Sequence, residues 1–418
     1  MFPADWLRET ARRTGLIKRA RKIDPVALFW ILALAYGVEM QRTLASLKRN
    51  YEERTDQTLS DGSWYDRFTP ELVKFLHACV LRGMEQLALE VHRPLGEKLS
   101  RFQDLLIQDS TVFRLHAKLA KRWPAVRTRV LAAGVKVATL ISVVANGPKS
   151  LAIHSESTSE YQTLRIGKWL KDRILLFDLG FYSFQTFARI EENGGFFVSR
   201  VKEGADLTLL RSLTVHRGRA IDLAGKKWND LLEKLRREVV DAEVEVKVKR
   251  RAYRGHRTME PHRFRLVAVY NEEARRYHVY LTNIPPDVLT AEEIASLYGC
   301  RWEIELVFKE LKSRYALDKI KTTNPQVVEA LIWVSCLTMI ISRTVYNMFR
   351  RVLPPEQIIR FTQMRWANSF VRFANRHLAS ILAYCGIEET MELHMEILSS
   401  QVLDPHVNRE RFREGYTA

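Results

Sequence analysis

Cysteine is scarce in this sequence, with four residues in 418. They lie far apart, at Cys79, Cys300, Cys336 and Cys385, and none forms a CxxC pair. A zinc knuckle needs closely spaced cysteines, and a disulfide framework is typical of short secreted chains rich in cysteine. The eleven histidines show no metal-ligand spacing. The sequence therefore argues against both kinds of site, and it fits a protein of the reducing cytoplasm.

Long hydrophobic runs are also missing. Residues 1–24 carry charges where a signal peptide would need an uninterrupted apolar core. The longest apolar run, residues 330–341, is interrupted by Ser335 and Thr338 and is too short to cross a bilayer. We therefore expect neither export nor a membrane partner, and we expect this run to form a buried helix.

Acidic residues are outnumbered, because 49 Asp and Glu stand against 66 Lys and Arg, for a net charge of +17. A positive field of this size favours polyanions, most often nucleic acid. A basic surface that only keeps the protein soluble is the alternative. The length allows two or three domains, and the sequence has no repeats or low-complexity tracts.

Residues 1–100 show helical periodicity, broken at Asp24-Pro25 and at the polar turn 60–63. Segment 43–51, this turn and residues 63–68 resemble a helix-turn-helix arrangement. The basic residues that would then face DNA phosphates are Lys48, Arg49, Arg54 and Arg67. A helical bundle with a solvated basic face explains the same pattern.

From residue 104 the pattern changes to apolar, β-branched runs separated by Gly, Pro and Asn, which predict strands at 104–115, 134–147 and 149–158. A helix over 159–170, capped by Ser159, and a buried strand over 173–180 should follow. A further helix (184–192) and strand (195–204) complete the segment. We therefore expect an α/β core.

Two aspartates lie in apolar strands, where burying a charged carboxylate costs free energy. Asp109 is inside the first strand among apolar residues, and Asp178 closes the fourth. A carboxylate in such a place needs an ion-pair partner or a metal, and open α/β sheets bind ligands at the carboxyl ends of their strands. Each aspartate alone could be a turn or capping residue, but two in neighbouring strands favour a site.

Residues 205–283 predict an insertion with a helix over 228–238 and strands over 243–253, 263–270 and 275–284. The first of these strands ends in a basic ribbon, which suits a nucleic-acid backbone or protects a sheet edge. The ribbon consists of Lys247, Lys249, Arg250, Arg251, Arg254 and Arg257.

A capping box at Thr290 predicts the start of the next helix. Taking residues 297–312 as one helix at about 100° per residue places four polar side chains on one stripe beside an apolar face. The stripe consists of Tyr298, Arg301, Glu305 and Lys312. Glu305 could also form a plain ion pair with Arg301 on a wet helix surface, and Trp302 could be core. Residues 325–397 predict further helices.

Asp109, Asp178 and Glu305 together form a set of three carboxylates. Two Mg²⁺ or Mn²⁺ ions about 3.5–4 Å apart need such a set for in-line phosphoryl transfer. One ion activates the attacking oxygen and the other stabilises the leaving oxygen.

With these three carboxylates at these positions, the sequence resembles the DDE transposases of bacterial insertion sequences. It looks most like the subgroup with a Tyr-Arg-Glu-Lys signature, in which Arg follows Tyr by three residues, Glu follows Arg by four and Lys follows Glu by seven. Residues Tyr298, Arg301, Glu305 and Lys312 match every interval. The two catalytic aspartates of the family match Asp109 in QDST and Asp178 in DLGFY.

The resemblance covers about residues 100–320 and implies a ribonuclease-H-like catalytic core interrupted by a β-rich insertion. The residue patterns outside this stretch predict helical N- and C-terminal regions, which fit the family less specifically. It assigns Asp109, Asp178 and Glu305 as catalytic metal ligands for two Mg²⁺ or Mn²⁺ ions. The residues that it implies in DNA-phosphate positioning are Tyr298, Arg301, Lys312, Arg200 and Lys202. Trp302 would stack on a base.

We therefore divide the chain into a helical DNA-binding domain (1–100), a first core part (101–204), the insertion (205–286), a second core part (287–350) and a helical C-terminal region (351–418). The expected function is that of a transposase, which binds the terminal inverted repeats of its element, cuts the ends and joins them to target DNA. Its partner is double-stranded DNA, on which we expect a homodimer, in the bacterial cytoplasm with the nucleoid. A DNA-binding protein that keeps only the fold, or a structure-specific nuclease, are the alternatives.

Overall fold

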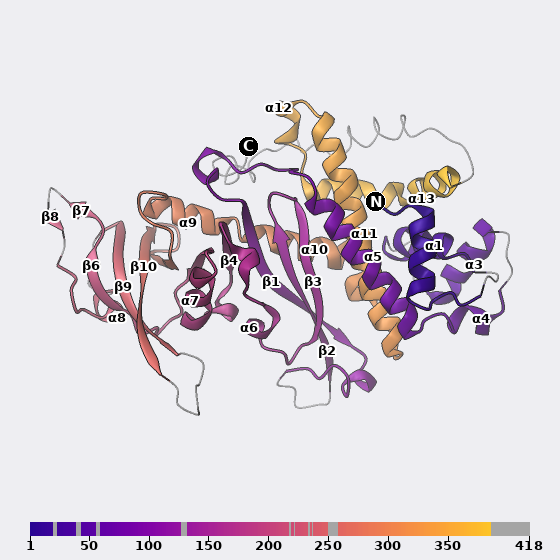
Figure 1. Ribbon diagram of the computed structural model, residues 1–418, viewed down its shortest axis with the longest axis horizontal. Coiled ribbons are helices and arrows are strands. Elements are labelled where there is room, and N and C mark those ends of the chain that lie inside the picture. The colour runs from indigo at the N-terminus through magenta and orange to yellow at the C-terminus, as the bar shows by residue number, and fades with distance from the viewer. Residues whose placement is uncertain are drawn as a thin grey trace.

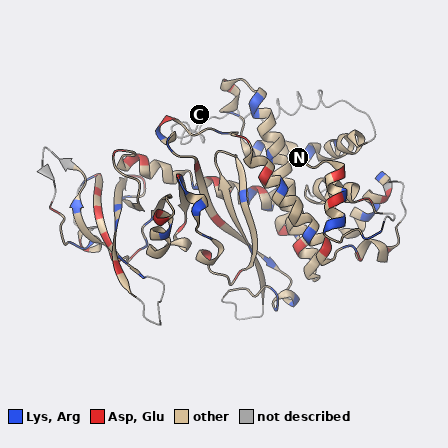
Figure 2. Cartoon of the chain, in the orientation of Figure 1, with Lys and Arg blue, Asp and Glu red and all other residues tan. Residues whose placement is uncertain are grey.

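The computed structural model describes residues 1–19, 23–38, 43–55, 59–126, 132–216, 219–220, 222–232, 235, 237–249 and 258–385. A nine-stranded sheet runs through the middle of the molecule, with the N-terminal helices at one end and the strands of the insertion at the other (Figure 1). Basic residues occur along this whole length (Figure 2). The protein is thus a mixed α/β molecule built on a large central sheet.

The strand order is β3-β2-β1-β4-β5-β11-β10-β9-β6. The first three strands form an antiparallel meander, and β1, β4 and β5 run parallel. The strands are β1 (Asp104–Leu115), β2 (Ala133–Ser142), β3 (Gly147–Ser155), β4 (Arg173–Phe177), β5 (Phe196–Arg200), β6 (Thr208–Ser212), β9 (Val239–Lys249), β10 (Met259–Asn271) and β11 (Arg276–Thr282).

The predicted insertion continues the central sheet instead of forming a separate one, because β11 pairs antiparallel with β5. The buried pair Asp241–Arg265 holds its strands together, and Arg265 also donates to two backbone carbonyl oxygens after β11. A small hairpin, β7 (Val215–His216) with β8 (Arg219–Ala220), extends beyond β6. Lys247 and Lys249 are exposed on β9, and the rest of the predicted basic ribbon lies outside the described residues.

Helices fill both ends of the chain. The N-terminal region contains α1 (Ala4–Arg13), α2 (Pro25–Ile31), the π-helix η1 (Leu32–Tyr36), α3 (Leu44–Thr55), α4 (Asp61–Tyr65) and α5 (Pro70–Ala88). The C-terminal region contains α11 (Pro325–Val352), α12 (Pro355–Ile358) and α13 (Gln363–Tyr384). Residues 386–418, for which we also expected helices, lie outside the described part.

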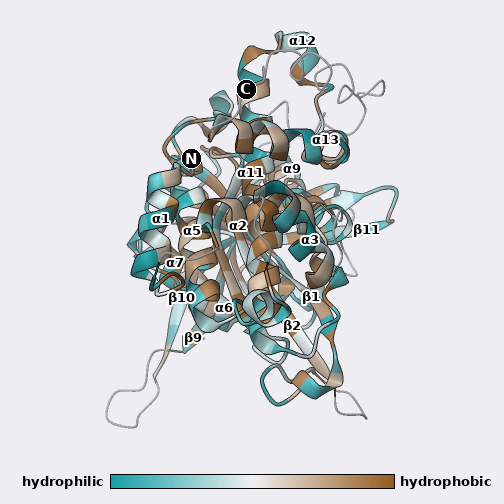
Figure 3. Ribbon diagram, turned by 90° about the vertical axis from the view of Figure 1, so that its right-hand side faces the viewer, coloured by the Kyte–Doolittle hydropathy of each residue, from teal (hydrophilic) through white to brown (hydrophobic). Residues whose placement is uncertain are grey.

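Helix α11 is the central helix of this end. It is long and apolar enough to cross a membrane, but 83% of its most apolar window is buried inside the protein. The predicted buried helix over residues 330–341 is therefore confirmed as part of α11. Viewed from this end of the molecule, α2 and α11 are mostly hydrophobic, and hydrophilic residues lie on α1 and α3 outside them (Figure 3).

The two faces of the sheet have separate cores. One face, with Ile107, Leu176 and Val198, shares a core with α9 (Ala291–Gly299), α10 (Trp302–Ser313) and the terminal helices. The other face, with Leu106 and Phe177, packs on α7 (Phe184–Glu192) and α8 (Trp228–Leu232). Short helical elements lie in the connections along the chain: η2 (Glu97–Leu99), η3 (Ala117–Leu119), α6 (Glu160–Thr163), η4 (Lys168–Leu170), η5 (Leu179–Phe181) and η6 (Leu317–Lys319).

The predicted helix over residues 159–170 is wrong. Only α6 and η4 form there, and Leu164 and Gly167 between them are extended. Ser159 occupies the N-cap position of α6, but its side chain makes no capping hydrogen bond. The apolar side chains of Leu164 and Ile166 pack against the sheet core, which holds the chain extended over the sheet.

The single helix predicted over residues 297–312 is also wrong. Helix α9 begins with the predicted capping box of Thr290 and Glu293, and a tight turn at Cys300 and Arg301 separates it from α10. In this turn the backbone N–H groups of Cys300 and Arg301 donate to the carbonyls three residues earlier. All four cysteines are free.

Candidate active site

The register of the parallel strands brings the two aspartates together. Gln108 of β1 pairs with Phe177 of β4, so Asp109 and Asp178 are the next residues along two neighbouring strands. Phe177 pairs with Ser199 of β5, so Arg200 lies level with Asp109 and Asp178 in one row across the three strands. Because side chains alternate along a strand, these three lie on the face that α9 and α10 cover.

Arg301 lies at the centre of the site. One guanidinium nitrogen of Arg301 is 2.6 Å from Glu305 Oε1, and another is 3.4 Å from Asp109 Oδ2. Asp178 is close enough to interact electrostatically with both Arg301 and Asp109. Arg301 therefore bonds two of the three predicted carboxylates and lies within electrostatic reach of the third. The Arg301–Glu305 contact is an i,i+4 ion pair in which the Arg301 side chain is 18% and the Glu305 side chain 34% exposed.

The carboxyl group of Asp109 is poorly solvated. Burial raises its pKa to about 6, the neighbouring carboxylates of Asp178 and Glu160 act in the same direction, and the Ser110 backbone N–H and Arg301 oppose them. Such a perturbed acid in a row of polar groups is typical of a functional site.

Tyr298 and Lys312 connect the two helices to the aspartate-bearing strands. The Tyr298 hydroxyl donates to the Phe177 carbonyl oxygen at 3.4 Å, and Lys312 Nζ donates to the Val112 carbonyl oxygen at 2.9 Å. Burial raises the pKa of the Tyr298 hydroxyl and lowers that of the Lys312 ammonium. All four residues of the predicted stripe thus contact β1, β4 or one another at the same edge.

The remaining predicted residues differ in their placement. Arg200 is close enough to Tyr298 to influence its hydroxyl electrostatically. Lys202 is exposed in the loop after β5. Trp302 is 59% exposed beside Arg301, so the alternative that it is a core residue is wrong.

The chemistry of the donor set fits a hard divalent cation, because Asp109, Asp178 and Glu305 offer only carboxylate oxygens. Within the described residues, no three His, Cys, Asp or Glu side chains are close enough together to hold a metal ion as they stand. At this site the Arg301 guanidinium forms ion pairs with both Asp109 and Glu305.

The family profile described as "Transposase DDE domain" matches residues 100–341, which is more than half of the chain. The chain belongs to this family of DDE transposases. It is 23% identical to the transposase of insertion sequence element IS231F from Bacillus thuringiensis subsp. israelensis, over 93% of this chain and 86% of the relative. The transposase of IS1151 from Clostridium perfringens is 20% identical over 82% of this chain and 78% of its own length. A shorter match, 38% identical over 18% of this chain, links it to the transposase of IS421 from Escherichia coli.

The second helix of the site in this transposase is anchored on its far side by two buried ion pairs. Glu303 binds Arg93 through two hydrogen bonds of 2.8 and 3.0 Å. Glu310 pairs with Arg343 of α11, and the Tyr315 hydroxyl lies 2.7 Å from Glu310 Oε1. Glu303 and Glu310 are seven residues apart and share one face of α10, about 140–160° around the helix from Glu305.

Sequence reasoning missed these pairs and also Glu160, which lies near Asp109. A glutamate at the start of a short helix carries no signal of its own, and its partners Ser110 and Lys136 lie 24 or more residues away along the chain. Only the fold brings them together.

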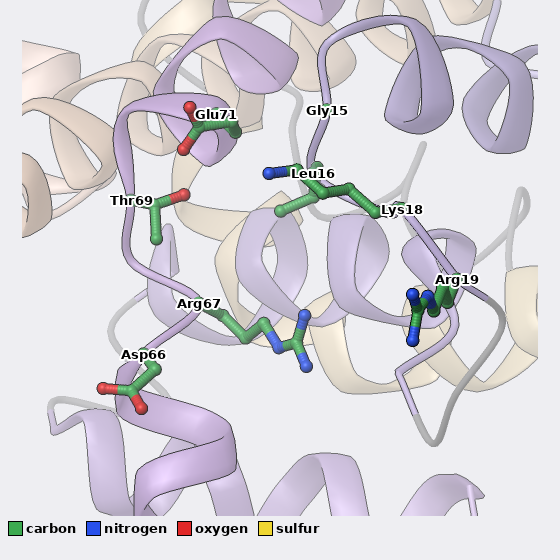
Figure 4. A pocket seen from close by; sticks show the side chains of 8 residues that line it. All are labelled: Gly15, Leu16, Lys18, Arg19, Asp66, Arg67, Thr69 and Glu71. Carbon is green, nitrogen blue, oxygen red and sulfur yellow. The ribbon is translucent and has the colours of Figure 1, made fainter.

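The N-terminal helices contain a polar cavity of about 440 Å³ between the end of α1 and the start of α5. Lys18, Arg19 and Arg67 line it together with Asp66 and Glu71, and Figure 4 shows Arg19 and Arg67 extending toward the same space. Arg67 is one of the residues predicted to face phosphates. In the predicted helix-turn-helix, however, the second helix, α4, has only five residues.

The other predicted phosphate contacts of this region are partly engaged within the protein. Lys48 pairs with Asp61 and Glu52, and Arg54 bonds the side chains of Asn50 and Asn375. Arg49 is exposed. The cavity and Arg49 are therefore the better candidates for an anionic partner at this end.

Proposed function

We propose that this transposase binds the terminal inverted repeats of its own insertion sequence, cleaves DNA at the ends and joins the 3′ ends to target DNA. The observation that carries the proposal is the convergence of Asp109, Asp178 and Glu305 around Arg301. The strand order β3-β2-β1-β4-β5, with its antiparallel meander and parallel partners, supports a ribonuclease-H-like core. The signature spacing supports the Tyr-Arg-Glu-Lys subgroup.

In this proposal Asp109, Asp178 and Glu305 hold two Mg²⁺ or Mn²⁺ ions, which activate the attacking oxygen and stabilise the leaving oxygen when bound. Arg301 neutralises the carboxylates in the metal-free protein and turns to a DNA phosphate when they bind metal. Arginine suits this change of partner, since its planar fork fits carboxylate and phosphate equally well.

Lys312, Tyr298, Arg200 and Lys202 position DNA phosphates beside Arg301, and Trp302 stacks on a base. The exposure of Trp302 supports this role, because an aromatic ring must be accessible to stack on a nucleobase. Arg200 lies in the row of the aspartates, so it reaches the scissile phosphate more directly than Lys202 does.

The N-terminal helices bind the inverted repeat in this account. Support comes from the basic cavity of Lys18, Arg19 and Arg67 and from a second cavity of about 560 Å³. The second cavity lies between these helices and the segment that follows α10, and Lys319 and Lys321 line it. We further propose a homodimer on paired DNA ends, in the bacterial cytoplasm.

The test is cleavage and joining of a labelled duplex that carries the inverted repeat, in Mg²⁺, with wild-type protein and with Asp109→Ala, Asp178→Ala and Glu305→Ala. Each variant should lose both reactions and still bind the duplex, because phosphate contacts position DNA independently of the metal ligands. Retained cleavage in any variant would remove that residue from the ligand set. Cleavage without joining by the wild-type protein would indicate a nuclease.

A further inference from the structure

Glu160 forms a hydrogen-bonded unit with Ser110 and Lys136. The Ser110 hydroxyl donates to the Glu160 carboxylate, with its two oxygens at 2.8 and 2.9 Å. Lys136 Nζ donates to Glu160 Oε1 at 2.7 Å and to the Thr158 carbonyl at 2.6 Å. The Lys136 side chain is only 7% exposed, so its charge requires a partner.

This unit lies on the face of the sheet opposite to the one that carries the Asp109 and Asp178 side chains. Ser110 follows Asp109 on β1, so its side chain points to the opposite face of the sheet. Lys136 lies on that same face, because it is two residues from Ala138, the partner of Ser110 on β2. The unit therefore braces β1 and β2 on the side that α10 does not cover.

Glu160 also reaches the turn that carries the second aspartate. Gly180 follows Asp178 by two residues, and a Cβ atom at Gly180 would come within 2.7 Å of Glu160 Cγ. The side chain of Glu160 thus packs against the backbone of this turn while its carboxylate holds β1 and β2. One residue connects both aspartate-bearing segments.

We propose that Glu160, with Ser110 and Lys136, is a positioning unit that fixes the orientation of Asp109 and its spacing from Asp178. The proposal rests on the proposed function. Ser110 is the link, because its backbone N–H donates to Asp109 Oδ1 at 2.7 Å while its hydroxyl is held by Glu160. Residues that hold a ligating carboxylate from behind typically change metal affinity or activity by about 10–100-fold.

The experiment measures Mn²⁺ binding to the full-length protein by calorimetry, followed by single-turnover cleavage of end DNA across Mn²⁺ concentrations. Ser110→Ala removes the link, and the double variant Glu160→Leu with Lys136→Met removes the brace without leaving a buried charge unpaired. Both should bind Mn²⁺ at least about tenfold more weakly. Ser110→Thr keeps the hydroxyl and should bind nearly as wild type does.

Glu243→Gln is the matched control. Glu243 pairs with Arg211 in the insertion and its side chain is 21% exposed, close to the 26% of Glu160, so Mn²⁺ binding should stay as in the wild type. Wild-type Mn²⁺ affinity in Ser110→Ala would overturn the proposal, whatever the melting temperature does and whether or not the double variant folds. Wild-type protein that neither binds Mn²⁺ nor cuts end DNA would instead remove the proposed function itself.

Discussion

Asp109→Asn should make the metal-free protein more stable at neutral pH, although it should abolish cleavage. Burial raises the pKa of Asp109 from 3.8 to about 6, and the side chain is only 20% exposed. A shift of this size corresponds to about 3 kcal/mol of folding free energy lost when the carboxyl group is charged. Asparagine has the shape of the protonated acid and avoids that cost, so the variant should gain up to about 3 kcal/mol.

The gain should depend on pH in a defined direction. Because the folded protein binds this proton more tightly than the unfolded chain does, the wild type loses stability as the pH rises from about 4 to about 6. Below about pH 4 both states are protonated, and wild type and variant should be equally stable. Above about pH 6 the difference should reach its full value.

The assay is urea unfolding in EDTA, monitored by tryptophan fluorescence, at about pH 4, 5, 6 and 7.5, which spans the range between the two pKa values. Asp241→Asn is the control, because Asp241 is buried with Arg265, and breaking such a pair destabilises by about 3–5 kcal/mol. If Asp109→Asn were less stable than the wild type at pH 7.5, or if the difference did not change with pH, the electrostatic account of the site would be wrong.

Three further predictions concern other parts of the molecule. Arg301→Ala or Lys312→Ala should slow cleavage by more than about tenfold, which is about 1.4 kcal/mol of transition-state stabilisation, and should weaken end binding far less. A variant that melts early yet cuts at the normal rate in single-turnover assays would contradict the phosphate role. The affinity for end DNA should fall steeply with salt, with a log-log slope of about 0.9 per neutralised phosphate, and a slope near zero in a fluorescence-anisotropy titration would argue against a duplex partner. Glu310→Leu should lower the unfolding free energy by about 3–5 kcal/mol, because it removes the carboxylate that pairs with the buried Arg343. Adding Arg343→Met to this variant should restore much of the loss in the same urea assay.

The positions of the core strands along the chain were predictable because their residues are apolar and β-branched and tight turns separate them. Their order in the sheet was not predicted. The site was predictable for a related reason, since Asp109 and Asp178 interrupt buried strands and the capping box of Thr290 marks where α9 begins. The break at Cys300 and Arg301 was not predicted, because both residues have nearly helical backbone angles. Gly299, the last residue of α9, was the one local signal for a helix end.

Other features could not be predicted because they depend on tertiary contacts. The extended segment after α6 is held by the packing of Leu164 and Ile166 on the sheet, which overrides their local helical pattern. Glu160, Glu303 and Glu310 are charged residues in ordinary helical positions, and their buried partners are distant along the chain. Only the folded chain shows that they support the site.

The most direct test of the account is to locate Mn²⁺ by anomalous scattering in crystals of the protein bound to end DNA. We expect Mn²⁺ bonded to carboxylate oxygens of Asp109, Asp178 and Glu305, with the Arg301 guanidinium moved onto a DNA phosphate. Mn²⁺ bound elsewhere, with Arg301 still between Asp109 and Glu305, would contradict it.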